Sequence, residues 1–527
     1  MLKTNGKDGA SIQMETRKLK RELTLLPLAG LIYFTVSGGT FGIEGLIGYS
    51  GPGLAMLLII LTPLVFSLPN VLMVRELTTL MPAEGGYYHW VKKAFGPFAG
   101  FMAGWNNWIV SWLDVAIYPV LAYYYLSFFF PALEQGPRLF GVSLWQIVIS
   151  GAIIWFISLL QIRGARISGI FTNGLGVLLI IPLFVMGGMG IYNWYAAGMP
   201  TGLPFLPGGQ PVNSASVSAA LSTGLFIVMW NYMGWELPSA AGSEVVNPKK
   251  TYPMALMIVL VGVALTYAIP VFGGLYGGGG VNNSYLLWGR EADTEAGIGA
   301  DLQDNYGLTP DQVQSLGVDP AASTGWEFPD IGRVVGNVFG GEKLGIFLGG
   351  WLTFGAVLSM IGLFTGNSLG GTRIPFALAE DGMFPRWLVK VHPRYGTPYI
   401  AIILTGLIYW FFASFDFSKL VVADVFLQLI VILAEFGALW VFRFKYKDLP
   451  RDRVRGGWFG LVLVTLGPVA IILVAIFSQF MEEGWSSLGW ALAFMLLGAA
   501  LYFPIYKYLK PGVPDVNPFD AGEPEEG

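Results

Sequence analysis

Runs of about twenty mostly apolar residues recur along the chain from Leu23 to Leu509. An α-helix of about that length crosses the ~30 Å hydrocarbon core of a lipid bilayer. Charged residues make up only 12% of the chain, against about 25% in a typical soluble protein. The sequence therefore predicts an all-α, polytopic membrane protein with twelve transmembrane helices. They are expected at about 23–49, 52–80, 97–130, 142–162, 167–190, 216–240, 254–275, 344–372, 398–414, 420–442, 457–479 and 487–506.

The distribution of lysine and arginine predicts the orientation of these helices, because cytoplasmic loops retain basic residues. With the N-terminus inside, 25 of the 30 basic residues fall in inside segments. The five outside are Arg138, Arg290, Arg333, Lys343 and Lys419. One miscounted helix would invert every later loop, so both termini are predicted to be cytoplasmic. The expected location is a plasma membrane or a bacterial inner membrane.

Composition disfavours several classes of function. The net charge is −4, which leaves no global basic field for nucleic acid. The chain has no cysteine, so neither a disulfide-linked subunit nor a cysteine-ligated metal is expected. His89 and His392 lie far apart, and no Gly-rich phosphate loop ending in Gly-Lys-Ser/Thr is present. We expect no enzyme, no ATP-driven pump, no metal site and no organic cofactor.

The first predicted helix contains a segment that disfavours helical structure. Residues 36–42 read Val-Ser-Gly-Gly-Thr-Phe-Gly near the expected bilayer centre. Each glycine costs a helix about 1 kcal/mol relative to alanine. Backbone groups freed by unwinding must be buried in protein or line a wet cavity. Glycines that serve only close helix packing are the alternative interpretation.

A second interruption occurs in the sixth predicted helix, where residues 230–238 read Trp-Asn-Tyr-Met-Gly-Trp-Glu-Leu-Pro. Breaks in the first and sixth helices are typical of two five-helix repeats of inverted topology. In such folds the substrate binds between the discontinuous helices. The paired placement favours that interpretation over glycine packing alone.

Four acidic residues inside the predicted spans have no basic partner at comparable depth. They are Glu44, Asp114, Glu236 and Glu435. Charge in mid-membrane is costly and marks a pathway or a pair. Each acid must be protonated, bound to backbone donors or water, or matched by a cationic ligand or ion. A neutral carboxyl that hydrogen-bonds across helices is the alternative for any single one.

One long outside loop, at about 276–343, carries ten acidic and three basic residues. Thr309-Pro310-Asp311 and Phe328-Pro329-Asp330 both resemble helix starts, with proline in the first turn. An acidic, partly helical cap is the simpler interpretation, and a lid over an outward vestibule is the alternative.

Several motifs give the chain a resemblance to the amino acid/polyamine/organocation permeases over nearly its whole length. They are the glycine break and the segments 82–87, 230–253 and 373–398. Within that superfamily the chain is most similar to the plant-type polyamine uptake branch and its microbial relatives. The residues that carry this similarity are 37–44, Asp114, 117–121 and Glu435-Phe436.

The resemblance implies the LeuT-type fold, a five-plus-five inverted repeat with two added helices. The expected parts are a cytoplasmic tail (1–22), a first repeat (23–190), a second repeat (216–442) that includes the loop 276–343, two further helices (457–506) and a C-terminal tail (507–527). It also implies that Trp230 is an aromatic gate and that Glu236 takes part in proton coupling. The predicted substrate-binding residues are Ser37, Gly38, Gly39, Thr40, Glu44, Asp114, Trp230, Asn231, Tyr232 and Glu236.

The predicted function is secondary active transport of amino acids or polyamines by alternating access. Uptake driven by protons is expected, with Glu236 or Glu44 as the group that exchanges the proton. The unpaired acids favour a cationic amine over a neutral amino acid. An exchanger on the same fold is the main alternative, and a channel is disfavoured because the acids form no ring or continuous pore.

Overall fold

The computed structural model describes residues 19–133, 135–292, 296–414, 421–449, 451–483 and 485–509. The tails predicted at 1–22 and 507–527 lie largely outside these described residues. Helices dominate the rest, and two short antiparallel strands form a hairpin, β1 (Arg138–Leu139) and β2 (Val142–Ser143).

The first half of the chain forms helices separated by short connections. They are α1 (Leu25–Val36), α2 (Glu44–Ser50), α3 (Pro52–Thr62), α4 (Leu68–Leu80), α5 (Tyr87–Phe95), α6 (Pro97–Phe129), α7 (Leu144–Arg163), α8 (Ala165–Ala196) and α9 (Ser214–Trp230). A π-helical turn, Pro63–Ser67, joins α3 to α4. Proline in the first turn of α3 and α6 is tolerated because that N–H has no partner within a helix.

The second half continues the pattern. Its helices are α10 (Pro248–Gly274), α11 (Ile298–Tyr306), α12 (Pro310–Ser315), α13 (Phe328–Gly340), α14 (Glu342–Glu380), α15 (Tyr399–Ala413), α16 (Val421–Lys445), α17 (Gly457–Glu483) and α18 (Trp485–Leu509). The starts of α12 and α13 agree with the two Pro-Asp signals of the predicted outside loop. Thr309 caps α12 by accepting the N–H of Gln312.

Nine helices in the described part of the chain are long and apolar enough to cross a membrane, and three shorter apolar ones accompany them. These elements lie at the positions of the twelve predicted apolar runs. Apolar side chains also face outward; Phe459, Leu463 and Leu466 on α17 are each more than 60% exposed. A surface of this kind suits hydrocarbon rather than water, so the chain is a polytopic helical membrane protein.

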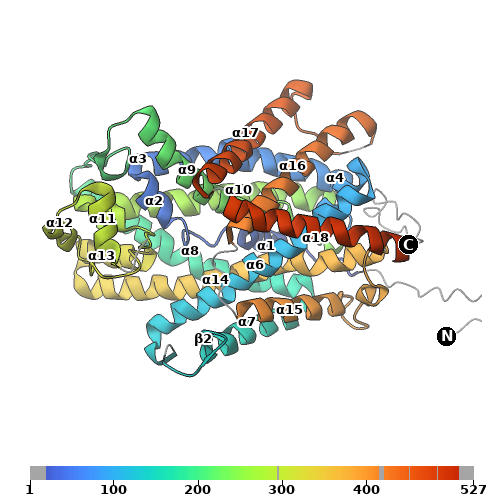
Figure 1. Cartoon of the computed structure of the whole chain (residues 1–527), viewed down its shortest axis with the longest axis horizontal. Helices are drawn as coiled ribbons and strands as arrows, with labels where there is room; N and C mark the ends of the chain where they lie inside the picture. Colours follow the sequence, from blue (N-terminus) through green and yellow to red (C-terminus); the bar gives the residue numbers. More distant parts are fainter. Residues whose placement is uncertain are drawn as a thin grey trace, which may run out of the picture.

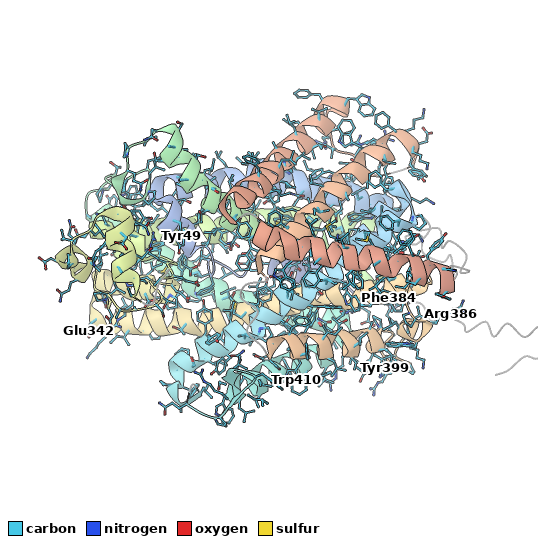
Figure 2. All side chains as sticks on the ribbon, viewed as in Figure 1. Tyr49, Glu342, Phe384, Arg386, Tyr399 and Trp410 are labelled. Carbon is cyan, nitrogen blue, oxygen red and sulfur yellow. The ribbon has the colours of Figure 1, made fainter. Side chains whose placement is uncertain are left out.

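Figure 1 shows α11, α12 and α13 clustered at one end of the elongated bundle, while α18 ends at the opposite end. α1 lies in the interior, where it packs against α8, α10 and α14. Side chains from neighbouring helices project into the space between them (Figure 2). The interior position of α1 brings the glycine run to the centre of the molecule.

One predicted boundary is wrong. The eighth apolar run was expected to end at 372 with Arg373 in a loop, but α14 continues to Glu380. Arg373 is fully buried and its Nε lies 2.9 Å from Glu244 Oε1. Because this pair neutralises the charge, the helix passes through the arginine instead of ending there.

Candidate functional site

The glycine run does interrupt the first helix. α1 ends at Val36 and α2 begins at Glu44, with Gly39 and Gly42 at φ values of 77° and 93°. The freed backbone groups find partners nearby. The Ser37 hydroxyl accepts the N–H of Gly39 at 3.1 Å, and Ser359 on α14 donates to the Gly38 carbonyl at 2.5 Å. The unwound segment is therefore stabilised by specific hydrogen bonds in the interior.

The second interruption lies beside the first. α9 ends at Trp230, and two short 3₁₀ turns, Leu237–Ala240 and Gly242–Glu244, precede α10. Gly234 has a φ of 95°, and a Cβ there would lie 2.7 Å from the carbonyl oxygen of Thr35. Only glycine permits this approach to the last turn of α1.

Asn231 connects the two breaks. Its side-chain amide donates to the Gly42 carbonyl at 3.1 Å and to the Ile227 carbonyl at 2.9 Å. Tyr267 on α10 donates in turn to the backbone carbonyl of Asn231 at 2.9 Å. Three segments that are distant in sequence thus share one hydrogen-bonded network in the interior.

Asp114 lies on α6 next to this network. Both of its carboxylate oxygens are 3.1 Å from the Tyr118 hydroxyl, and the Trp230 side chain also lies within hydrogen-bonding reach. Trp230 in turn packs on the first break, since a Cβ at Gly42 would lie 3.1 Å from its ring. The arrangement puts one carboxylate and one aromatic ring at the meeting point of the two interrupted helices. No lysine or arginine forms an ion pair with Asp114 among the residues described.

Glu44 accepts hydrogen bonds from backbone N–H groups. This is one of the alternatives expected for an acid without a basic partner. Its Oε2 accepts the N–H of Gly42 at 2.7 Å, and its Oε1 accepts the N–H of Phe328 at 3.1 Å. Phe328 is the first residue of α13, within the segment predicted as the long outside loop. The buried carboxylate therefore ties the first break to that loop.

Other acids gather around the start of α13. Partial loss of water around its carboxyl raises the pKa of Glu327, as do the negative charges of Asp330 and Glu291, while a hydrogen bond from Tyr125 opposes the rise. Asp330 Oδ2 accepts the N–H of Glu327 at 3.1 Å. Arg290 is also close to α2, where it donates to the Gly48 carbonyl at 3.0 Å, but it forms its ion pair with Asp301.

Glu236 contacts other residues than Asp114 does. Its Oε1 lies 3.3 Å from Nε2 of Gln428 on α16, and the carboxyl of Glu435 on the same helix interacts with it. Both acids are buried, and neither forms an ion pair within the described part of the chain. Neither oxygen of Glu435 has a hydrogen-bond partner there. The sequence identified both acids as candidates but did not predict that their charges would interact.

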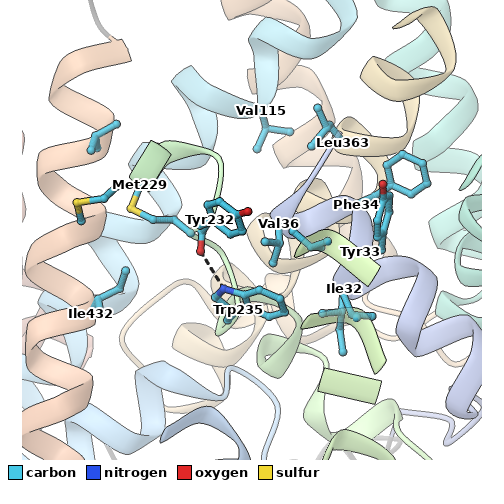
Figure 3. Packing of buried hydrophobic residues seen from close by; sticks show 14 of the residues in the cluster. Ile32, Tyr33, Phe34, Val36, Val115, Met229, Tyr232, Trp235, Leu363 and Ile432 are labelled. Carbon is cyan, nitrogen blue, oxygen red and sulfur yellow. Dashed lines mark hydrogen bonds between the residues drawn. The ribbon is translucent and has the colours of Figure 1, made fainter. Parts of the chain in front are cut away.

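The remaining predicted site residues have mixed surroundings. Thr40 is buried, and its hydroxyl has no partner among the described residues. The Tyr232 hydroxyl donates to the Ile59 carbonyl at 3.1 Å, and Trp235 donates to the Tyr232 carbonyl at 2.8 Å (Figure 3). Tyr232 and Trp235 lie near Val36, at the end of α1, in the same view. The Tyr232 ring thus supports the second break, and its hydroxyl is engaged with α3.

A buried ionic cluster was missed by sequence reasoning. Arg373 pairs with Glu244 and also donates to Gln161 Oε1 at 3.3 Å. Ser243 donates to Glu84 at 2.6 Å, and the charges of Glu84, Glu244 and Arg373 interact. Burial and the negative charge of Glu244 raise the pKa of Glu84, while Arg373 lowers it. Glu244 lies in the conspicuous segment 242–253, so the sequence did point to this acid. Sequence spacing alone, however, does not pair it with Arg373.

The helical membrane-spanning architecture and two interrupted helices that meet at a polar centre define a multi-span membrane transporter. The chain belongs to the amino acid permease family, since a model of that family matches residues 23–502. This match confirms the resemblance inferred from the motifs. The protein is a permease and not an enzyme.

Three relatives illustrate the range of similarity. Polyamine transporter PUT1 of Oryza sativa subsp. japonica is 30% identical over 488 residues, covering 92% of this chain and 79% of the relative. Polyamine transporter RMV1 of Arabidopsis thaliana is 30% identical over 467 residues, covering 88% and 82%. The serine/threonine exchanger SteT of Bacillus subtilis (strain 168) is 25% identical over 446 residues, covering 83% and 86%.

Proposed function

We propose that the protein takes up cationic amines, polyamines in particular, by proton-coupled alternating access. The observation that carries this proposal is Asp114, a carboxylate at the junction of the two helix breaks that has no basic partner among the residues the structure describes. A substrate ammonium group would supply the missing positive charge. The names of the plant relatives, both polyamine transporters, support the same substrate class.

In this mechanism the carbonyls and hydroxyls of Ser37–Thr40 and the Asn231 network form the polar floor of the site. Asp114 binds the ammonium group, and the Trp230 ring covers it through a cation–π contact. The hydroxyl of Thr40, which has no partner in the described part of the chain, supports a ligand contact at that position. Glu44 holds the outer loop against the first break. Its hydrogen bond to Phe328 would therefore break when the transporter opens toward the side of that loop.

Protons are the proposed coupling ion, and Glu236 is the proposed carrier. It is buried beside Glu435 with no ion-pairing cation among the described residues. Two buried carboxyls whose negative charges interact, with no cation to balance them, favour the binding of a proton by one of them. Glu44, the other candidate from the sequence, already accepts two backbone N–H bonds, so we assign it a positioning role.

We further propose the twelve-helix, five-plus-five inverted repeat, with both termini cytoplasmic and residues 23–190 and 216–442 as the repeats. The positions of the twelve apolar helices and the interruptions in the first and sixth support this topology. The basic residues concentrated in inside segments support the orientation. The membrane is proposed to be a plasma membrane or a bacterial inner membrane.

Uptake of labelled putrescine and arginine by proteoliposomes tests this function. An imposed gradient with acid outside should drive accumulation, and dissipating it with a protonophore should abolish the accumulation. Uptake that ignores the gradient would rule out proton coupling.

An exchanger is the second candidate, supported by the similarity to the serine/threonine exchanger. It predicts that uptake requires internal substrate. Liposomes preloaded with serine, threonine or putrescine would then accelerate uptake, and empty liposomes would show none even with a proton gradient.

A further inference from the structure

A cavity of about 430 Å³ lies where the loop between α16 and α17 folds against the end of α4. Arg75, Arg453 and Arg455 line it, together with a single acid, Asp452. An ion pair joins Arg75 to Asp452, while Arg453 and Arg455 are exposed. Three guanidinium groups against one carboxylate leave the cavity positively charged. Such a cavity suits an anionic group.

The loop that presents these arginines is fixed to the helices. Glu76 on α4 accepts the backbone N–H of Val454 at 2.9 Å and a bond from Arg443 at 2.5 Å. Thr79 accepts the N–H of Asp452 at 3.1 Å. Glu76 also forms an ion pair with Arg451 at 3.3 Å. Glu76 therefore neutralises Arg443 and Arg451, which do not line the cavity, and leaves the charges of Arg453 and Arg455 unbalanced.

The rest of the cavity lining is largely apolar. Leu72, Leu463 and Val464 belong to it, and Leu463 is 62% exposed. The same face of α17 continues outward with Phe459 and Leu466, which are 77% and 64% exposed. A basic recess next to an outward apolar strip matches a ligand that combines an anionic head with a hydrocarbon chain. A free anion would leave that apolar lining uncovered.

We propose that this cavity binds the headgroup of an anionic phospholipid, with Arg453 and Arg455 on the phosphate and an acyl chain along the exposed face of α17. Basic pockets between transmembrane helices recognise acidic lipid headgroups by this chemistry. In the orientation proposed above, the lipid belongs to the cytoplasmic leaflet. The site is separate from the two helix breaks and does not depend on the identity of the transported substrate.

The test compares the thermal unfolding of the full-length detergent-purified protein with added phosphatidylglycerol, phosphatidylcholine of the same acyl chains, or inorganic phosphate. Phosphatidylglycerol should raise Tm more than phosphatidylcholine does, since a ligand that binds the folded state stabilises it. Phosphate alone should have no effect. The difference between the two lipids should shrink at high salt.

The double variant Arg453→Gln/Arg455→Gln should lose at least half of the phosphatidylglycerol-specific shift. The matched control is Arg163→Gln/Arg166→Gln, two exposed arginines at the α7–α8 junction, which should keep the full shift. Native mass spectrometry of bound phosphatidylglycerol gives a second readout, with the single variant Arg455→Gln available if the double variant does not fold. Equal stabilisation by both lipids, equal loss in the control, or stabilisation by phosphate alone would overturn the lipid site.

Discussion

The side-chain amide of Asn231 donates a 3.1 Å hydrogen bond to the carbonyl of Gly42, 189 residues earlier in the chain. This bond joins the end of α9 to the unwound segment between α1 and α2. Each break would otherwise leave backbone groups without partners in a region that excludes water. The two interruptions therefore stabilise each other, and a movement of one changes the surroundings of the other.

Replacing Asn231 with alanine should uncouple the breaks. The Gly42 carbonyl would lose this partner, and a buried polar group without a partner costs about 1–3 kcal/mol. We expect a lower Tm and weaker substrate binding, measured by thermal unfolding and equilibrium binding of labelled putrescine. Asn213→Ala serves as the control because Asn213 caps the exposed start of the same helix. A control variant that weakens binding as much as Asn231→Ala would contradict the coupling.

Asp114→Asn should discriminate between charged and neutral substrates. The substitution keeps the shape of the side chain but removes the negative charge next to Trp230 and Tyr118. Binding of putrescine should weaken at least about tenfold, equivalent to about 1.4 kcal/mol. Binding of a neutral amino acid such as alanine should change much less. Isothermal titration of both ligands measures the difference, and equal effects would argue against a cationic substrate at Asp114.

Glu236→Gln should separate proton coupling from substrate movement. With its titratable proton removed, the variant should no longer accumulate putrescine in response to a pH gradient. Counterflow between preloaded and external putrescine should persist, because it requires no net proton movement. Glu435→Gln tests whether the neighbouring acid shares this role. Gradient-driven accumulation at the wild-type level in the Glu236 variant would exclude it as the proton carrier.

Arg373→Met should destabilise the protein strongly. Its loss leaves Glu244 and Glu84 buried without their positive partner, and breaking a buried pair in this way costs about 3–5 kcal/mol. Adding Glu244→Leu should recover part of the Tm, because the uncompensated charge is then removed as well. A double variant no more stable than Arg373→Met would show that the ion pair is not the source of the loss.

The local features of the fold were predictable from the sequence because they depend on neighbouring residues. The glycines at 38, 39 and 42 disfavour helix, and Pro310 and Pro329 mark helix starts, so these boundaries follow from backbone chemistry. The position of Asp114 within an apolar run is equally plain.

The pairing of distant residues was not predictable in the same way. Nothing in the spacing places Phe328 on the Glu44 carboxylate or pairs Arg373 with Glu244. These contacts depend on how the helices pack, which hydrophobic periodicity does not specify when nearly every face of a helix is apolar. The same limit explains why Glu236 and Glu435 were recognised separately and not as neighbours.

The acidic start of α13 predicts a pH dependence of stability. The folded-state pKa of Glu327 lies above its ordinary value of 4.5, chiefly because the surrounding protein removes part of the water around its carboxyl, although the residue keeps exposed surface, and also because of Asp330 and Glu291. The fold therefore disfavours the ionised form, and this group's contribution to stability is lost as pH rises from about 4.5 through the folded-state pKa. Glu327→Gln removes the cost, so its Tm should exceed that of the wild type at pH 8 and converge with it near pH 4. Glu342→Gln, at the exposed start of α14 (Figure 2), should show no such divergence. Parallel Tm curves for Glu327→Gln and the wild type between pH 4 and 8 would contradict the assignment.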